Sequence, residues 1–283
     1  MEKLIQICTD ASLYNGKFDN TGWAAAGMGY ILVTESNRFI VIDGGFAEDA
    51  QKIIKMLEEM SHELVPTVDL WIITHSHGDH YGALMEICNR PELAARVKIK
   101  ELLYYFPEEF IDNRGNTCNV APNTDMEKVI ETFGAVRHIP TVDEKFEVDG
   151  LLLHFLYVPT DCESINHRAN ANICSLIFTI TAQNKKVMIT GDAWKKTLNK
   201  VVESYRGQLK CDILQLPHHA LCDTGSAQFY REVSADTAIL PISIAGNRAM
   251  NTLYYDQNGD NREAVERANR VIKAFEGNIE IEL

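Results

Sequence analysis

The chain has 283 residues, of which 46% are hydrophobic and 24% are charged, so it can bury a sizeable core and is not a disordered chain. Its formal net charge of −13 repels phosphate backbones, which argues against a broad surface for long nucleic acid. The seven cysteines are scattered and include no Cys-x-x-Cys pair, which argues against a disulfide framework and against a cysteine-rich zinc site.

Targeting and linker signals are missing from the sequence. No apolar run approaches the roughly 18 residues that cross a bilayer, and residues 1–10 lack the apolar region of a signal peptide. We therefore expect a cytoplasmic protein with no membrane partner. Because no repeat, low-complexity tract or Pro/Gly/Ser-rich linker divides the chain, we expect one domain over residues 1–283. The sequence gives no indication of the oligomeric state.

Short apolar strands alternate with amphipathic helices, which predicts an α/β layered fold. Hairpin-length polar loops join the first two predicted strands and also the sixth and seventh. In chain order the predicted strands are Tyr30–Val33, Phe39–Ile42, Leu70–Thr74, Leu102–Phe106, Leu151–Val158, Ser175–Thr181, Lys186–Thr190, Ile213–Leu216 and Thr237–Leu240.

The predicted helices show apolar residues at helical spacing. A capping box, Thr124-x-x-Glu127, is expected to begin the third helix, and Gly134 to end it. The apolar stripe that ends before Gly277 predicts a last helix. The predicted helices are Ala50–Leu57, Tyr81–Cys88, Met126–Phe133, Trp194–Tyr205, Ala227–Val233 and Val265–Phe275.

The segment after the strand Leu70–Thr74 carries most of the chemistry, because His75, His77, Asp79 and His80 fall within six residues. His75 and His77 are two residues apart, so both side chains can point the same way from an extended chain. Asp79 and His80 are adjacent, point differently, and can serve a second ion. Imidazole and carboxylate ligands suit Zn²⁺, Mn²⁺ or Fe. The segment therefore predicts two neighbouring metal sites.

The segment Thr74-His75-Ser76-His77-Gly78-Asp79-His80 resembles the signature loop of the metallo-β-lactamase superfamily. Two further elements extend this resemblance along the chain. Val41-Ile42-Asp43-Gly44-Gly45 is similar to an early strand whose aspartate supports the metal loop from behind, which is the role expected of Asp43. Val187-Met188-Ile189-Thr190-Gly191-Asp192 is similar to the strand whose aspartate bridges two metals, which is the role expected of Asp192.

Two more elements resemble one branch of that superfamily, the metallo-β-lactamase domain of bacterial DNA-uptake channel proteins. The first is the strand that leads into Pro217-His218-His219, although Ala220 stands where the branch has Gly. Either histidine is then the expected ligand, and the other donates to a phosphate or supports the ligands. The second is Asn172-Ile173-Cys174-Ser175-Leu176, found where other members place a histidine ligand. The third ligand of the first metal is therefore open, with Asn172 and His167 as candidates.

The resemblance implies a fold, a cofactor and a reaction. The expected fold is a four-layer αββα sandwich with two divalent ions at one edge, Zn²⁺ before Mn²⁺ or Fe. The expected function is hydrolysis by a metal-activated water that Asp79 orients, with His218 or His219 stabilising the developing charge. We expect a phosphodiester or related phosphoester, as a small molecule or short nucleotide. The alternatives are a thioester or lactone hydrolase, a mononuclear iron oxygenase and a non-catalytic metal-binding protein.

Overall fold

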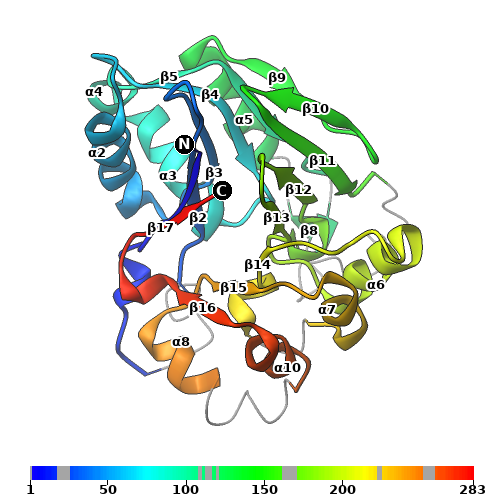
Figure 1. Cartoon of the computed structure of the whole chain (residues 1–283). Coiled ribbons are helices and arrows are strands. Elements are labelled where there is room, and N and C mark those ends of the chain that lie inside the picture. The colour runs from blue at the N-terminus through cyan, green and yellow to red at the C-terminus, as the bar shows by residue number, and fades with distance from the viewer. Residues whose placement is uncertain are drawn as a thin grey trace.

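Two β-sheets pack face to face, and helices cover the outer face of each sheet (Figure 1). This arrangement confirms the expected four-layer α/β sandwich. The computed structural model of the chain describes residues 2–17, 26–107, 110–111, 117–118, 121–160, 171–221, 225–250 and 259–283.

The first sheet has eight strands within the described ranges, in the order β17-β1-β2-β3-β4-β6-β9, with β5 paired to β4. Its parallel part runs from β3 to β9, and the remaining pairs are antiparallel. The first and last strands of the chain, β1 and β17, lie side by side (Figure 1). The strands are β1 (Lys3–Gln6), β2 (Gly29–Val33), β3 (Phe39–Asp43), β4 (Thr67–Ile73), β5 (Lys98–Ile99), β6 (Glu101–Tyr104), β9 (Val136–His138) and β17 (Ile279–Glu282).

The second sheet has seven strands in the described part of the chain, in the order β10-β11-β12-β13-β14-β15-β16. It is antiparallel from β10 to β13 and parallel from β13 to β16. The short strands β7 (Phe110–Ile111) and β8 (Thr117–Cys118) pair separately. The strands of this sheet are β10 (Lys145–Val148), β11 (Leu151–Tyr157), β12 (Ile177–Thr181), β13 (Lys186–Ile189), β14 (Ile213–Gln215), β15 (Thr237–Leu240) and β16 (Arg270–Lys273).

Side-chain alternation along the strands creates three apolar layers. In β2, Tyr30 and Leu32 face the layer between the sheets, whereas Ile31 and Val33 face the helices. Every residue of this strand is buried, as expected for strands covered on both faces. One outer layer lies under α2, α3 and α5, and the other lies under α6, α7 and α10.

The helices are amphipathic and present their apolar stripes to the sheets. No helix of the described residues is both long and apolar enough to cross a bilayer. The helices are α2 (Ala50–Met60), α3 (Gly78–Asn89), α4 (Pro91–Ala94), α5 (Ala121–Phe133), α6 (Lys195–Tyr205), α7 (Ala227–Val233), α8 (Ile244–Ala249) and α10 (Gly259–Arg267).

Two predictions about the helices are wrong. The predicted helix Val265–Phe275 ends at Arg267, and residues 270–273 form β16, because Val271 and Ile272 pair with β15. The capping box at Thr124 does not begin α5, which already starts at Ala121. Both predicted hairpins are confirmed, since β2 with β3 and β12 with β13 pair antiparallel.

The topology brings four strand ends to one edge of the sandwich. β3 and β4 are parallel neighbours in the first sheet, and β13 and β14 are parallel neighbours in the second. Their carboxyl ends lead into Asp43, the His75–His80 segment, Asp192 and the His218–His219 pair. The carboxyl ends of parallel strands are where α/β sheets form binding sites. The fold therefore gathers the His75–His80 segment with Asp43, Asp192 and the His218–His219 pair, which the sequence motifs singled out.

Candidate metal centre

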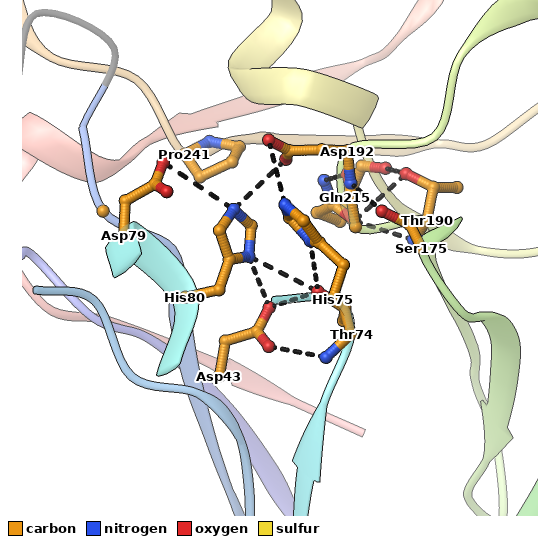
Figure 2. Close-up of polar contacts among 12 residues, drawn as sticks. Asp43, Thr74, His75, Asp79, His80, Ser175, Thr190, Asp192, Gln215 and Pro241 are labelled. Carbon is orange, nitrogen blue, oxygen red and sulfur yellow. Dashed lines mark hydrogen bonds and ion pairs between the residues drawn. The ribbon is translucent and has the colours of Figure 1, made fainter. Parts of the chain in front are cut away.

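The donor side chains converge at one edge of the sandwich, where His75 and His80 point toward the carboxylate of Asp192 (Figure 2). Asp79, His80, Asp192 and His219 form one group of potential ligands, and His75, His77 and Asp192 form a second. Within each group, one ligand atom from each residue lies within 4.8 Å of the others. Because Asp192 belongs to both groups, its two carboxylate oxygens can serve two ions.

The distances around Asp192 support this shared position. Its Oδ1 lies 3.4 Å from the Nε2 of His80. Its Oδ2 lies 3.8 Å from the Nε2 of His75 and 3.6 Å from the Nε2 of His219. Asp79 closes the first group, with its Oδ2 3.2 Å from the Nε2 of His219 and 3.8 Å from that of His80.

Hydrogen bonds at Nδ1 orient two of the histidine rings toward the centre. The Nδ1 of His80 donates to the Oδ2 of Asp43 at 2.8 Å, and the Nδ1 of His219 donates to the carbonyl oxygen of Pro241 at 2.6 Å. The Nδ1 of His75 contacts the hydroxyl of Thr74 at 3.2 Å, and that hydroxyl donates to Asp43 at 2.8 Å. A ring whose Nδ1 carries the proton offers its Nε2 lone pair to a metal.

Buried nitrogen and oxygen atoms that lack hydrogen-bond partners show whether these residues fit a metal ion. His75, His80 and His219 are at most 1% exposed, and the Nε2 of each has no hydrogen-bond partner among the described residues. The Oδ1 of Asp192 is also buried, and no described residue hydrogen-bonds to it. Buried polar groups are almost always paired, so this many donor and acceptor atoms without partners around one carboxylate are what a bound cation would satisfy. Imidazole nitrogen and carboxylate oxygen are the atoms that zinc binds, and the residues therefore fit a divalent cation.

The buried histidines and aspartates of the cluster shift one another's pKa values. Burial opposes protonation of His80, yet the carboxylates of Asp192 and Asp43 raise its pKa well above the usual value. Burial likewise opposes ionisation of Asp192, yet His80 and His219 lower the pKa of its carboxyl well below the usual value. Burial lowers the pKa of His75, which stays neutral. The carboxylates therefore stay ionised in a buried place, where a cation would be strongly bound.

The turn that carries Asp192 has little room for other residues. Gly191 has φ +53°, and a Cβ there would lie 2.9 Å from the side chain of Ser175. The hydroxyl of Ser175 accepts from the amide of Asp192 at 2.9 Å. Gln215, buried in β14, accepts from the amide of Thr190 at 2.7 Å and donates to the carbonyl of Gly191 at 2.9 Å. The Gly-Asp turn is thus held by Gln215 in the neighbouring strand β14 and by Ser175, which lies just before β12.

A left-handed turn decides which of the two adjacent histidines joins the cluster. His218, His219 and Ala220 have φ values of 50°, 56° and 57°. Residues other than glycine rarely adopt this conformation, and the strain is typical of functional sites. The turn sends His219 into the donor group, while His218 stays outside both groups and is partly exposed. The Nδ1 of His218 is buried and has no hydrogen-bond partner among the residues that the structure describes, which exclude residues 222–224.

Three other residues, Asp43, Asn172 and His167, were predicted from the sequence to support or complete the metal site. Asp43 is fully buried behind His80, as its expected supporting role requires. Asn172 is 2% exposed in a short helical turn, and its carbonyl accepts from the amide of Ser175 at 3.1 Å. His167 lies outside the described residues. Sequence reasoning missed the supporting residues Thr74, Ser175, Gln215 and Pro241, although the place of Thr74 at the end of an apolar strand beside the histidines was a usable signal.

Comparison with known proteins agrees with this geometry. A model of the metallo-beta-lactamase superfamily matches residues 29–224, which include every donor in the two groups. Competence protein ComA of Neisseria gonorrhoeae is 22% identical over 219 residues, which are 77% of this chain and 26% of ComA. The chain thus spans about a quarter of the length of that relative.

Solved structures share the fold at low identity. Zn²⁺-bound PqqB from Methylobacterium extorquens superposes with a TM-score of 0.60 at 13% identity, covering all of both chains. A diphosphatase of the PhnP family gives 0.52 at 12% identity, covering 100% of this chain and 98% of its own. The diiron β-hydroxylase CmlA from Streptomyces venezuelae gives 0.53 at 10% identity, covering 99% of this chain and 54% of its own. At such identities the likeness concerns the fold alone.

Proposed function

Because this chain belongs to the metallo-beta-lactamase superfamily, we propose that it is a metal-dependent hydrolase acting on a phosphodiester or related phosphoester. The observation that carries the proposal is the cluster around Asp192. Three buried Nε2 atoms without hydrogen-bond partners meet the carboxylates of Asp79 and Asp192 there. We take this donor set as two adjoining sites for divalent cations, with Zn²⁺ preferred over Mn²⁺ or Fe.

Bound cations would supply Lewis acidity and make water nucleophilic near neutral pH. The protein's own residues have separate tasks in this proposal. His75, His77, Asp79, His80 and His219 would hold the cations together with Asp192. We assign to Asp79, whose side chain is 13% exposed, the orientation of the attacking water and the acceptance of its proton.

We assign the substrate contact to His218. It is partly exposed beside the donor groups, and its Nδ1 has no hydrogen-bond partner in the described part of the chain. A neutral imidazole in this position can donate one hydrogen bond to a phosphoryl oxygen and so favour the charge that develops there.

The choice of a phosphoester has three supports. The sequence elements at Asn172 and at His218–His219 resemble the DNA-uptake branch, and ComA is a weak match over most of this chain. A diphosphatase of the PhnP family shares the fold. Two adjacent cations can clamp the attacking and leaving oxygens of a displacement at phosphorus. The net charge of −13 favours a small diester or a short nucleotide over long nucleic acid.

A panel assay on metal-loaded protein tests the reaction class. We expect turnover of bis-p-nitrophenyl phosphate to exceed turnover of thioesters, lactones and β-lactams, and Asp192→Ala to abolish it. Thioester or lactone turnover that exceeds diester turnover by about tenfold would make the protein a thioester or lactone hydrolase.

Metal analysis separates the hydrolase from the oxygenase and from the non-catalytic alternative. We expect two Zn²⁺ or Mn²⁺ per chain, whereas one Fe would indicate an oxygenase and the absence of metal would indicate a protein that has lost catalysis.

A further inference from the structure

Two buried polar side chains lie opposite each other on neighbouring strands of the first sheet. Gln6 in β1 pairs with Tyr30 in β2, and both residues are 0% exposed. Tyr30 belongs to the apolar layer between the sheets. Gln6 faces the same layer, because Ile5 and Ile7 on either side of it face the helices. Side chains at directly opposite positions have Cβ atoms about 5 Å apart, so the two polar groups are neighbours within this layer.

The described residues leave one polar atom on each of these side chains without a hydrogen bond. The hydroxyl of Tyr30 has no partner among them. The Nε2 of Gln6 donates to the carbonyl of Ile7 at 2.9 Å, whereas its Oε1 accepts from no described residue. Buried polar atoms of this kind are usually satisfied by an internal water that bridges them. The pair therefore offers a hydroxyl and a carbonyl acceptor to one small molecule that can both donate and accept.

Tyr30 lies at the end of β2 that faces the metal centre. It pairs with Ile42, the residue before Asp43. Burial, and then the negative charges of Asp43 and Asp192, raise the pKa of its hydroxyl well above the usual value. The hydroxyl is therefore near both carboxylates and stays neutral around neutral pH. A neutral hydroxyl can donate a hydrogen bond in the direction of a carboxylate.

The two carboxylates near Tyr30 differ in how many hydrogen bonds they already accept. Asp43 accepts from the amide and the hydroxyl of Thr74 and from the Nδ1 of His80. The Oδ1 of Asp192 accepts no hydrogen bond within the described part of the chain. A carboxylate oxygen has two lone pairs, so this Oδ1 can bind a cation with one and accept from a water with the other. Asp192 is therefore the carboxylate with a free place for a water.

We propose that Tyr30 and Gln6 hold a water molecule on the inner side of the metal centre, and that this water donates a hydrogen bond to the Oδ1 of Asp192. The hydroxyl of Tyr30 donates to the water, whose two protons go to Asp192 and to the Oε1 of Gln6. Tyr30 is then a positioning residue, which acts on the cations only through the carboxylate that both donor groups share. The inference rests on the cation sites of the proposed function and not on the reaction that they catalyse.

The internal water can be counted in the metal-free protein. Magnetic relaxation dispersion of the solvent nuclei counts internal waters that exchange slowly. Tyr30→Phe removes the hydroxyl and keeps the ring, and Gln6→Met removes the acceptor and keeps the length of the side chain. We expect each variant to lose one such water. The double variant should lose no more than either single variant, because both changes remove the same molecule.

Metal binding tests whether the water positions Asp192. We expect Tyr30→Phe to weaken Zn²⁺ binding by about 10- to 100-fold and to shift the absorption spectrum of the Co²⁺-loaded protein, because a ligating carboxylate loses a hydrogen-bond partner. Tyr104→Phe is the matched control. Tyr104 is also 0% exposed, and no described residue hydrogen-bonds its hydroxyl, but it lies under the helices on the other face of the sheet. It should leave the affinity and the spectrum as they are.

Two results would overturn the proposal. One is the wild-type number of internal waters in Tyr30→Phe, which would show that the hydroxyl holds none. The other is the wild-type Co²⁺ spectrum and Zn²⁺ affinity in Tyr30→Phe, which would show that Asp192 is positioned without this water. The proposed function fails separately: a wild type that binds neither Zn²⁺ nor Co²⁺ would refute the metal centre, and the water count would still decide whether Tyr30 and Gln6 hold a water.

Discussion

Asp43 orders the candidate metal centre although it belongs to neither donor group. Its carboxylate accepts from the Nδ1 of His80 and from both the amide and the hydroxyl of Thr74, each at 2.8 Å. The backbone of Asp43 is left-handed, with φ 55°, a conformation that asparagine tolerates about as well as aspartate. Asp43→Asn therefore removes the charge while keeping the backbone and the size of the side chain.

We expect Asp43→Asn to weaken Zn²⁺ binding by about 10- to 100-fold, because the ring of His80 loses its charged anchor. Competition with a chromogenic chelator measures the affinity, and circular dichroism reports whether the fold is kept. Asp69→Asn is the matched control, since Asp69 pairs with Arg38 and Lys100 instead. Wild-type affinity in Asp43→Asn would mean that the carboxylate does not orient the ligand.

His218 gives a second prediction at the scale of one side chain. Its backbone is left-handed, so the suitable substitution is again asparagine, which tolerates that conformation and lacks the imidazole. We expect His218→Asn to lower kcat for a diester by about 10- to 100-fold while the metal content stays at the wild-type level. Steady-state kinetics with metal analysis measures both, and His62→Asn serves as the control. A loss of metal that parallels the loss of turnover would make His218 a ligand instead.

The candidate metal donors could be proposed from the sequence because most of them lie in short contiguous segments. His75, His77, Asp79 and His80 are brought together by local geometry alone. The supporting contacts were not predictable, since the carbonyl of Pro241 and the side chain of Gln215 reach the centre from distant strands. The choice between His218 and His219 also escaped prediction. It depends on a left-handed turn, which glycine would have signalled and Ala220 does not.

At the scale of elements, the central strands were predicted and the outer ones were not. β4 and β13 are apolar and covered on both faces, so their composition is enough to identify them. β9, β10 and β16 are edge strands, and nearly all of their residues are exposed or only partly buried, which leaves a weak apolar pattern. In β16 the spacing of apolar residues even matched a helix. Pairing with β15 overrode that local preference, because strand pairing depends on residues far away in sequence.

The short helical turn Ala47–Asp49, which joins β3 to α2, depends on a buried carboxylate. Asp49 is 0% exposed and accepts from the amides of Asp10 at 2.7 Å and Phe46 at 3.0 Å. Burial raises the pKa of this carboxyl from its usual 3.8 to about 6. The folded state therefore holds the proton more tightly than the unfolded chain does. The contribution of Asp49 to stability is fully present below pH 3.8 and is lost as the pH rises to about 6.

Asp49→Asn tests this pH dependence, because asparagine does not titrate. We expect the free energy of unfolding of the wild type, minus that of Asp49→Asn, to fall by up to about 3 kcal/mol between pH 4 and pH 6.5. Urea unfolding at a series of pH values measures it, and the metal contribution cancels because both proteins share the metal centre. Glu48→Gln changes an exposed carboxylate of the same turn and should give a flat difference. A flat difference for Asp49→Asn as well would show that Asp49 is ionised throughout.

At the scale of the whole molecule, the two sheets share one apolar layer. That layer collects buried residues from both sheets and from both ends of the chain, from Leu4 to Leu283. Neither sheet could bury this face alone, and the donor cluster draws ligands from both. The shared layer supports our proposal that residues 1–283 form one domain, in which separating the sheets would dismantle the metal centre.

The net charge of −13 is the other property of the whole molecule that bears on function. A chain with this charge repels an approaching polyanion at a distance, whereas a small diester carries a single charge that the metal centre meets directly. Enzymes that bind nucleic acid through lysine and arginine lose affinity as salt rises, because the counterions that they displace become costlier to release. In this protein the long-range interaction between the acidic surface and a polyanionic substrate is repulsive, so added salt should weaken that repulsion.

We therefore expect kcat/KM for a single-stranded oligonucleotide to rise, by roughly two- to fivefold, as NaCl increases from about 0.05 M to about 0.3 M. Over the same range kcat/KM for bis-p-nitrophenyl phosphate should change much less, because a substrate with one charge feels little of the field. Both substrates are assayed with the same metal-loaded protein, so an effect of salt on the metal centre would appear in both series and can be subtracted. A rate on the oligonucleotide that falls steeply with salt would instead show that basic side chains contact its phosphates, and the preference for small substrates would then be wrong.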